Sequence, residues 1–163
     1  MQIKLPMKPD FNIESIYDID IMHLKEIGIK ALFFDLDSTL MKSKSAKFSY
    51  KTLQFLNDLN DVFKLAIITN NKNPEYIKKA KQQTNIPIYS NAKKPQTATL
   101  IRACMDLNVN AKETAMIGDR PLSDILAGKK AKMVTILVDS ISKNEENFIV
   151  RFARFLERLT IKK

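Results

Sequence analysis

Two aspartates separated by a single residue follow an apolar run in the first quarter of the chain. Residues 31–34 (ALFF) lead directly into Asp35, Leu36 and Asp37. If the backbone is still extended there, the two carboxylates project to the same side. Such a pair suits Mg²⁺, or a division of roles between nucleophile and general acid/base. It also suits a polar turn after a strand, so the rest of the chain has to decide.

Four more polar residues stand at or after the ends of later elements. Thr69 closes the apolar run 64–69, Lys94 precedes a helical pattern, Asp119 closes the run 115–119, and Asp124 follows it. The carboxyl ends of parallel strands share one edge of a sheet, where ligands bind. This inventory suits phosphoryl transfer. One carboxylate attacks phosphorus and another moves protons, while a hydroxyl and an ammonium hold oxygens and Mg²⁺ neutralises charge.

Length and composition limit the classes of protein to consider. The chain has 163 residues, 45% of them hydrophobic, which is enough for one domain with a core. It has no apolar run of membrane-spanning length and no signal-peptide pattern, so we expect a soluble cytoplasmic protein. Cys104 is the only cysteine, which excludes a disulfide framework and favours a core position. The net charge of +9 fits either an anionic partner or a solvated lysine-rich surface.

Apolar runs alternate with helical patterns along the chain, which predicts an α/β fold with a mainly parallel sheet. We expect five strands, at 31–34, 64–69, 86–89, 115–119 and 133–138, the third of them at an edge because of Pro87. The expected helices cover 50–59, 73–83, 93–107, 120–128 and 144–159. An extended arm (1–12) and a helix (13–27) come first. With three glycines and no glycine-rich loop, dinucleotide-binding and P-loop enzymes are disfavoured.

The last expected helix carries an apolar stripe and several arginines. Phe148, Phe152, Phe155 and Leu159 recur at helical spacing, accompanied by Arg151, Arg154 and Arg158. Amphipathic helices in α/β domains usually face the core, so we expect the stripe to cover the sheet and the arginines to be solvated. The alternative is that this helix contacts an anionic membrane surface.

In order along the chain, these residues resemble the four motifs of the haloacid dehalogenase (HAD) superfamily of phosphatases. Residues 35–39 (DLDST) are similar to the DxDxT motif, and Thr69 matches the hydroxyl residue that ends the second motif strand. Lys94 matches the motif lysine, ahead of its neighbour Lys93, and residues 118–124 (GDRPLSD) are similar to GDxxx[ST]D. All four motifs in order, over residues 31–138, are far more specific than any one of them.

The resemblance implies a role for each residue. Asp35 would be the nucleophile and a Mg²⁺ ligand, and Asp37 the general acid/base that also lends its backbone carbonyl to the metal. Thr69, Asn70 and Lys94 would bind the phosphoryl group. Asp119 would ligate Mg²⁺, with Asp124 a ligand directly, through water or as a support. The presence of Asp37 favours a phosphatase or phosphotransferase over a dehalogenase.

The implied fold is a single domain over residues 1–163, a Rossmann-like three-layer sandwich with helices on both faces. Residues 1–29 would pack on this core as an arm and a helix, and 144–163 would form the C-terminal helix. The short intervals from Asp37 to Thr69 and from Thr69 to Lys94 leave no room for an inserted cap domain. A capless site is open, which suits a large substrate.

Nearly the whole chain resembles one branch of the superfamily, the YqeG-type and mitochondrial phosphatidylglycerophosphatases. Segments 8–10 (KPD), 15–20 (SIYDID) and 24–30 (LKEIGIK) carry this likeness. It implies a Mg²⁺-dependent phosphomonoesterase of the IIIA type that acts on a lipid headgroup phosphate, with peripheral contact at the inner membrane face. A nucleotide or polynucleotide phosphatase is the alternative, although no nucleic-acid-binding module is evident. A non-catalytic receiver-like phosphoacceptor would have no need of Asp37.

Overall fold

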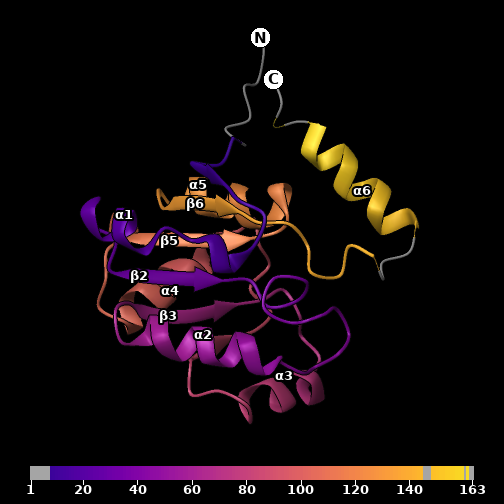
Figure 1. Cartoon of the computed structure of the whole chain (residues 1–163), viewed down its shortest axis with the longest axis horizontal. Coiled ribbons are helices and arrows are strands. Elements are labelled where there is room, and N and C mark those ends of the chain that lie inside the picture. The colour runs from indigo at the N-terminus through magenta and orange to yellow at the C-terminus, as the bar shows by residue number, and fades with distance from the viewer. Residues whose placement is uncertain (1–7, 145–147, 160, 162–163) are drawn as a thin grey trace.

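The computed structural model describes residues 8–144, 148–159 and 161, and its centre is a parallel six-stranded sheet (Figure 1). The strand order is β1-β6-β5-β2-β3-β4, and all five neighbouring pairs are parallel. The strands are β1 (Phe11–Asn12), β2 (Ala31–Phe34), β3 (Lys64–Ile68), β4 (Ile88–Tyr89), β5 (Thr114–Gly118) and β6 (Val134–Leu137). In Figure 1 the strands point the same way, so their carboxyl ends form one edge.

Helices cover both faces of the sheet, which makes the fold the predicted three-layer α/β sandwich. One core joins the sheet to α1 (Ile21–Glu26), α2 (Tyr50–Asn60) and α3 (Pro74–Lys81). The other joins it to α4 (Ala98–Asp106) and α5 (Leu126–Lys130). Short helical turns lie at Ile16–Asp18, Ala111–Glu113 and Pro121–Ile125, and the last helix is α6 (Phe148–Leu159).

Strand β2 occupies the middle of the sheet and is buried along its whole length. Leu32 and Phe34 enter one core and Ala31 and Phe33 the other, because successive side chains of a strand point to opposite faces. Its neighbours are β3 and β5. The register pairs Phe34 with residues of both neighbouring strands, so the segments that follow β2, β3 and β5 emerge together.

The sheet has six strands where the sequence predicted five. The additional strand, β1, lies within the segment expected to be only an extended arm, and it pairs with β6. The carboxylate of Asp10 anchors this pairing, since it accepts hydrogen bonds from the amide (2.8 Å) and hydroxyl (2.9 Å) of Thr135. A two-residue strand has no hydrophobic period, so only its tertiary partner reveals it. Residues 1–7 of the expected arm lie outside the described residues.

Several helix boundaries differ from the expectation. The segment 13–27 forms a short turn and then α1, which Asp20 caps, instead of one helix. Helix α4 begins at Ala98, after Lys94, and Pro121–Ile125 is a π-helical turn before α5. The edge position of β4 and the burial of Cys104 are confirmed.

Helix α6 has the opposite orientation from the one predicted. Its apolar residues are exposed, and it stands beyond the carboxyl edge of the sheet in Figure 1 instead of covering a face. The described helix begins at Phe148, and residues 145–147 of the expected range lie outside the described residues, as do 160 and 162–163. Within the described residues, no helix combines the length and apolar character that crossing a bilayer would require.

Candidate active site

The site forms around a buried ion pair between Asp35 and Lys94. Asp35 directly follows β2, and its amide still donates to the carbonyl of Ile117 in β5 (2.9 Å), so the strand fixes its position. The ammonium of Lys94 donates to Asp35 Oδ1 (2.8 Å), to Asp124 Oδ1 (2.7 Å) and to the carbonyl of Ile68 (2.7 Å). All three donor protons of the lysine are therefore used, which points the ammonium at the end of β2.

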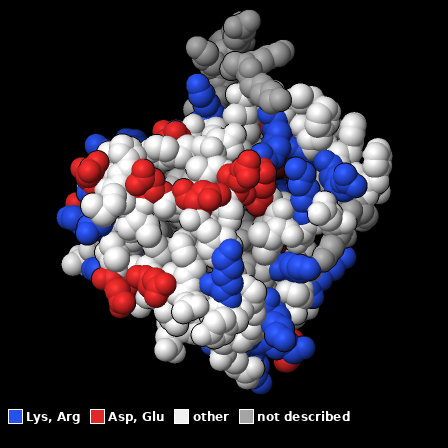
Figure 2. Space-filling model, viewed as in Figure 1, with Lys and Arg blue, Asp and Glu red and all other residues white. Residues whose placement is uncertain are grey.

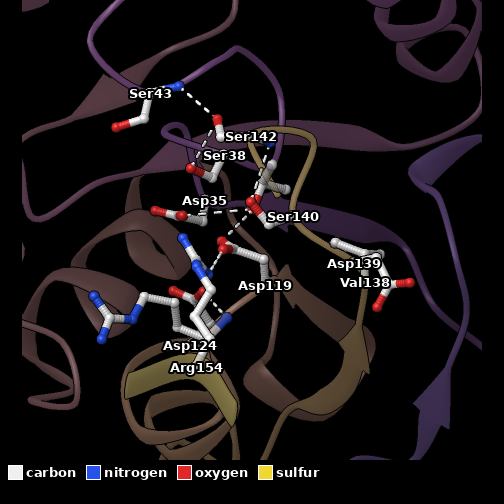
Figure 3. A network of polar contacts seen from close by, with 12 residues as sticks. Asp35, Ser38, Ser43, Asp119, Asp124, Val138, Asp139, Ser140, Ser142 and Arg154 are labelled. Carbon is white, nitrogen blue, oxygen red and sulfur yellow. Dashed lines mark hydrogen bonds and ion pairs between the residues drawn. The ribbon is translucent and has the colours of Figure 1, made fainter. Parts of the chain in front are cut away.

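The carboxylate of Asp119 completes a buried acidic triad with those of Asp35 and Asp124. Oxygens of the three carboxylates all lie within 4.8 Å of one another. The hydroxyl of Thr39 donates to Asp119 Oδ1 (2.9 Å). Figure 3 shows the three side chains gathered at one place, although they come from different segments of the chain.

Burial and the charges of neighbouring carboxylates raise the pKa values of Asp35, Asp119 and Asp124. Burial raises the pKa of Asp35 to about 6, against the opposing effect of Lys94. Burial and the charge of Asp35 raise the pKa of Asp124 to about 6 as well. The pKa of Asp119 is raised by burial and by Asp124. Although burial alone would lower the pKa of Lys94, the charges of Asp124 and Asp35 raise it, so the lysine is cationic.

The residues from Gly118 to Asp124 form one compact unit at the end of β5. The amide of Arg120 donates to Asp124 Oδ2 (3.1 Å) across the π-helical turn. A Cβ atom at Gly118 would lie 2.2 Å from Asp124 Oδ2, so only glycine leaves room for this carboxylate. The glycine of the motif is therefore needed for packing, in addition to the two carboxylates.

The carboxylate of Asp37 stands apart from the triad and has its own partners. It accepts a very short hydrogen bond from the hydroxyl of Tyr76 and a longer one from the side-chain amide of Asn71 (3.5 Å). Burial and the charge of Asp37 raise the pKa of Tyr76, so the tyrosine stays a hydrogen-bond donor. Asp37 lines the same cavity as Asp35. This side chain is thus held for a task other than binding metal with the triad.

Thr69 and Asn70, which follow β3, also line the cavity. The Asn70 side chain accepts from the amide of Lys94 (2.7 Å) and donates to the carbonyl of Lys94 (3.0 Å), so it clamps the lysine's backbone. The Thr69 hydroxyl accepts from the amide of Asn71 (3.1 Å). Asn70 thereby positions Lys94 from a neighbouring loop.

Helix α6 supplies a side of the cavity that the motifs do not predict. The cavity has a volume of about 710 Å³, and Val150, Arg154 and Glu157 of α6 line it. The guanidinium of Arg154 donates a very short hydrogen bond to Asp119 Oδ2, and Arg120 donates to Glu157 Oε1 (2.6 Å). Arg154 reaches from α6 into the acidic triad in Figure 3.

The acidic triad fits a divalent metal ion by its chemistry. Carboxylate oxygens are the ligands that Mg²⁺ prefers, and three of them converge here. Burial raises the pKa of each of the three groups most, and repulsion from a neighbouring carboxylate raises it further. A bound cation would relieve that repulsion.

The structure brings together all the residues that the motifs single out. Lys94 pairs with Asp35 and Asp124, and Asp119 lies within 4.8 Å of both carboxylates. Asp37, Thr69 and Asn70 line the cavity. Sequence reasoning missed Tyr76 and Asn71, which hold Asp37, and it placed Arg154 in solvent. No local pattern marks Tyr76 as a site residue. In the sequence, Arg154 stands out only as one of the three arginines of the last expected helix.

Comparisons with known proteins identify the family of the chain. Residues 2–142 match the family model described as mitochondrial PGP phosphatase. The Bacillus subtilis protein named probable phosphatase YqeG is 29% identical over 151 residues, which cover 92% of this chain and 87% of that protein. The phosphatidylglycerophosphate phosphatase 1 of Arabidopsis thaliana is 27% identical over 95% of this chain. The match covers 47% of the Arabidopsis protein, so the chain spans about half of its length.

Solved structures share the fold. A 2-haloacid dehalogenase from Pseudomonas syringae aligns with a TM-score of 0.58 and 14% identity, over 74% of this chain and 89% of that one. The cobalt-bound deoxy-D-mannose-octulosonate 8-phosphate phosphatase from Haemophilus influenzae aligns with a TM-score of 0.52 and 16% identity, over 78% and 73%.

Proposed function

The chain belongs to the family of mitochondrial PGP phosphatases, a branch of the HAD superfamily, and we propose that it hydrolyses a lipid headgroup phosphate through an aspartyl-phosphate intermediate. As a member of this family it is a phosphoric monoester hydrolase. One observation carries the mechanism: the carboxylate of Asp35 is bound by a buried lysine and faces a cavity that Asp37 also lines.

The proposed first step forms a bond between Asp35 and phosphorus while the ester bond to the substrate breaks. Asp37 gives a proton to the leaving oxygen, so the alcohol departs neutral. Lys94 keeps Asp35 oriented, and its hydrogen bond to Asp35 would pass to a phosphoryl oxygen once Asp35 is bonded to phosphorus. Thr69 would hold a second oxygen of the transferred phosphoryl group. Mg²⁺ held by the acidic triad and the Asp37 carbonyl would supply positive charge against the negative phosphoryl oxygens.

The proposed second step returns the enzyme to its starting state. A water molecule attacks the phosphorus, Asp37 accepts a proton from that water, and the bond between phosphorus and Asp35 breaks. Inorganic phosphate and the free Asp35 carboxylate result. The hydrogen bonds from Tyr76 and Asn71 support this role, because they hold Asp37 in place away from the triad.

The lipid proposal rests on the family and on an open site. The Arabidopsis relative is named for phosphatidylglycerophosphate, in which the phosphomonoester is part of the headgroup. The chain segments between Asp37 and Lys94 form α2, β3, α3 and β4 and contain no inserted cap domain. We propose that residues 1–163 act as one domain, and that the protein works from the cytoplasm at the inner membrane face.

Phosphate release from p-nitrophenyl phosphate tests the chemistry. We expect turnover by the wild-type protein with Mg²⁺ and its loss in EDTA. Asp35→Asn should be inactive, and Asp37→Asn should lose about a hundredfold or more, the usual contribution of a general acid/base. Wild-type activity that persists in Asp35→Asn would overturn the assignment of the nucleophile.

A substrate comparison tests the specificity. Phosphatidylglycerophosphate in mixed micelles, a set of nucleotides and a set of sugar phosphates are compared by kcat/KM. We expect the lipid to be preferred. Turnover of the soluble phosphates without turnover of the lipid would reject the lipid proposal and leave the phosphatase assignment intact.

A further inference from the structure

The two faces of α6 have different surroundings. An α-helix has about 3.6 residues per turn, so Val150, Arg154 and Glu157 share one face, and this face lines the active-site cavity. Arg154 binds Asp119, and Arg120 binds Glu157. These contacts hold the helix over the carboxyl edge of the sheet.

The opposite face of α6 is apolar and exposed. Its members are Phe148, Ile149, Phe152, Phe155, Leu156 and Leu159. Phe148 is 79% exposed and Ile149 76%, and the ring of Phe152 stacks against those of Phe148 and Phe155 at centroid distances of 6.0 and 6.5 Å. Contiguous apolar surface of this kind is unusual on a folded domain and marks an interaction site. We call these six residues the apolar face of α6.

Basic side chains border the apolar face. A groove of about 620 Å³ runs along α6, and its lining includes the three phenylalanines together with Arg151, Arg158 and Lys143. Asp139 also lines the groove, and Arg158 pairs with its carboxylate (3.2 Å) and donates to the carbonyl of Val138 (3.0 Å), which ties this border to the end of β6. In Figure 2 lysine and arginine side chains gather on the side where α6 lies, and most acidic side chains in view lie across the other side.

We propose that the apolar face of α6 docks on an anionic membrane. The aromatic and aliphatic side chains would enter the boundary between headgroups and acyl chains, and Arg151, Arg158 and Lys143 would bind lipid phosphates. The reverse side of the same helix lines the catalytic cavity. Docking would therefore place the membrane surface one helix diameter, about 10 Å, from the catalytic cavity. This deepens the proposed function and rests on it for the identity of the lipid.

Charge favours a membrane over a second copy of the chain as the occupant. The chain has a net charge of +9, and cationic residues border the apolar face, so two copies meeting there would repel each other. An anionic bilayer offers negative headgroups to the cationic residues and an apolar interior to the apolar face. Self-association through the same face is the competing outcome, and it would appear as a dimer in solution.

Vesicle co-sedimentation tests the proposal with the full chain in EDTA. One set of vesicles contains phosphatidylcholine alone, and the other contains phosphatidylcholine with phosphatidylglycerol. We expect binding to the anionic vesicles that weakens with added salt. The double variant Phe148→Ser with Phe152→Ser should bind at least about tenfold more weakly, because each ring that leaves water contributes to the affinity. Arg151→Gln should weaken binding and lessen its salt dependence.

Matched controls separate docking from loss of fold. Met105 on α4 is 76% exposed, the same as Ile149, so Met105→Ser and Ile149→Ser remove similar apolar surface from different places. Only Ile149→Ser should weaken vesicle binding. All of these variants should turn over p-nitrophenyl phosphate as the wild type does, while their turnover of vesicle-borne phosphatidylglycerophosphate should fall with binding.

Three results would overturn docking: no vesicle binding by the wild type, equal losses in Met105→Ser and Ile149→Ser, or a dimer in solution that Phe152→Ser dissociates. Failure of the proposed function is a separate result. The binding assay contains no phosphomonoester and no metal, so a protein that binds vesicles without hydrolysing the lipid would refute the substrate and leave docking in place.

Discussion

Replacing Asp35, the proposed nucleophile, with asparagine should make the metal-free protein more stable at neutral pH. The substitution keeps the size of the side chain and removes its charge. Asp35 lies within 4.8 Å of carboxylate oxygens of Asp119 and Asp124, and its neighbourhood is buried. The charged form is therefore costly in the folded protein, even with Lys94 beside it.

The raised pKa gives the size of this effect. Burial moves the pKa of Asp35 from 3.8 to about 6, and the value already includes the favourable charge of Lys94. The shift of about 2 units corresponds to about 3 kcal/mol. The folded protein binds the proton of the Asp35 carboxyl group more tightly than the unfolded chain does. The stabilisation that this protonated group contributes is therefore fully present below about pH 4. It is lost as the pH rises through about 6.

Urea unfolding of wild type and Asp35→Asn in EDTA measures this difference. At about pH 7.5 the variant should be more stable by up to about 3 kcal/mol, which shifts its midpoint by about 1–2 M urea. At about pH 4 the two proteins should unfold together. Asp58→Asn, an exposed position on α2, is the control and should differ from wild type by less than about 0.5 kcal/mol.

Adding Mg²⁺ to the same experiment tests the metal site. Ligands that bind only the folded protein stabilise it by mass action, so Mg²⁺ should stabilise the wild type and should stabilise Asp35→Asn less. The reasoning is refuted if Asp35→Asn is less stable than wild type at neutral pH without metal. In that case the ion pair with Lys94 outweighs the burial of the charge.

Three further substitutions probe the partners of the acidic residues. Tyr76→Phe removes the hydroxyl that binds Asp37, so kcat on p-nitrophenyl phosphate should fall about tenfold with little change in KM. Gly118→Ala places a Cβ atom 2.2 Å from Asp124 Oδ2, so urea unfolding should show a loss of about 1–3 kcal/mol and weaker stabilisation by Mg²⁺. Lys94→Gln leaves buried carboxylates without their ammonium, and should cost about 3–5 kcal/mol in EDTA, part of which Mg²⁺ restores.

Controls for these substitutions come from exposed residues of the same types. Tyr50 is 80% exposed, so Tyr50→Phe should leave kcat unchanged, and equal losses in Tyr50→Phe and Tyr76→Phe would contradict the role of Tyr76. Lys64→Gln, at an exposed lysine, should cost far less than Lys94→Gln. Gly118→Ala with wild-type stability and Mg²⁺ response would mean that the Asp124 carboxylate can move without consequence.

Asp35, Thr69 and Asp119 could be placed from the sequence because each directly follows a strand with a clear pattern. A strand buried on both faces reads as an unbroken apolar run, and 31–34 is such a run. Parallel pairing then carries Asp35, Thr69 and Asp119 to one edge, whatever the details of the helices between them.

The additional strand and the partners of Asp37 could not be predicted in this way. Strand β1 has two residues, and its pairing with β6 depends on Asp10 reaching Thr135, far away in the chain. Tyr76 stands in the first turn of α3, where nothing local distinguishes it from a surface tyrosine. Its contact with Asp37 exists only because the loop after β2 passes that helix.

Strand β2 was placed correctly from the sequence, whereas the orientation of α6 was not. This difference separates what the sequence determined from what the tertiary structure decided. The sequence determined the types of the site residues and where most of them gather, since Asp35 and Asp119 directly follow strands with local signals. It also determined that α6 is amphipathic. Which face of α6 meets the protein depended on the surface it meets, and that surface is the anionic mouth of the site, with Asp119 available to Arg154. An ion pair with a buried carboxylate turned the arginine inward and left the phenylalanines outside.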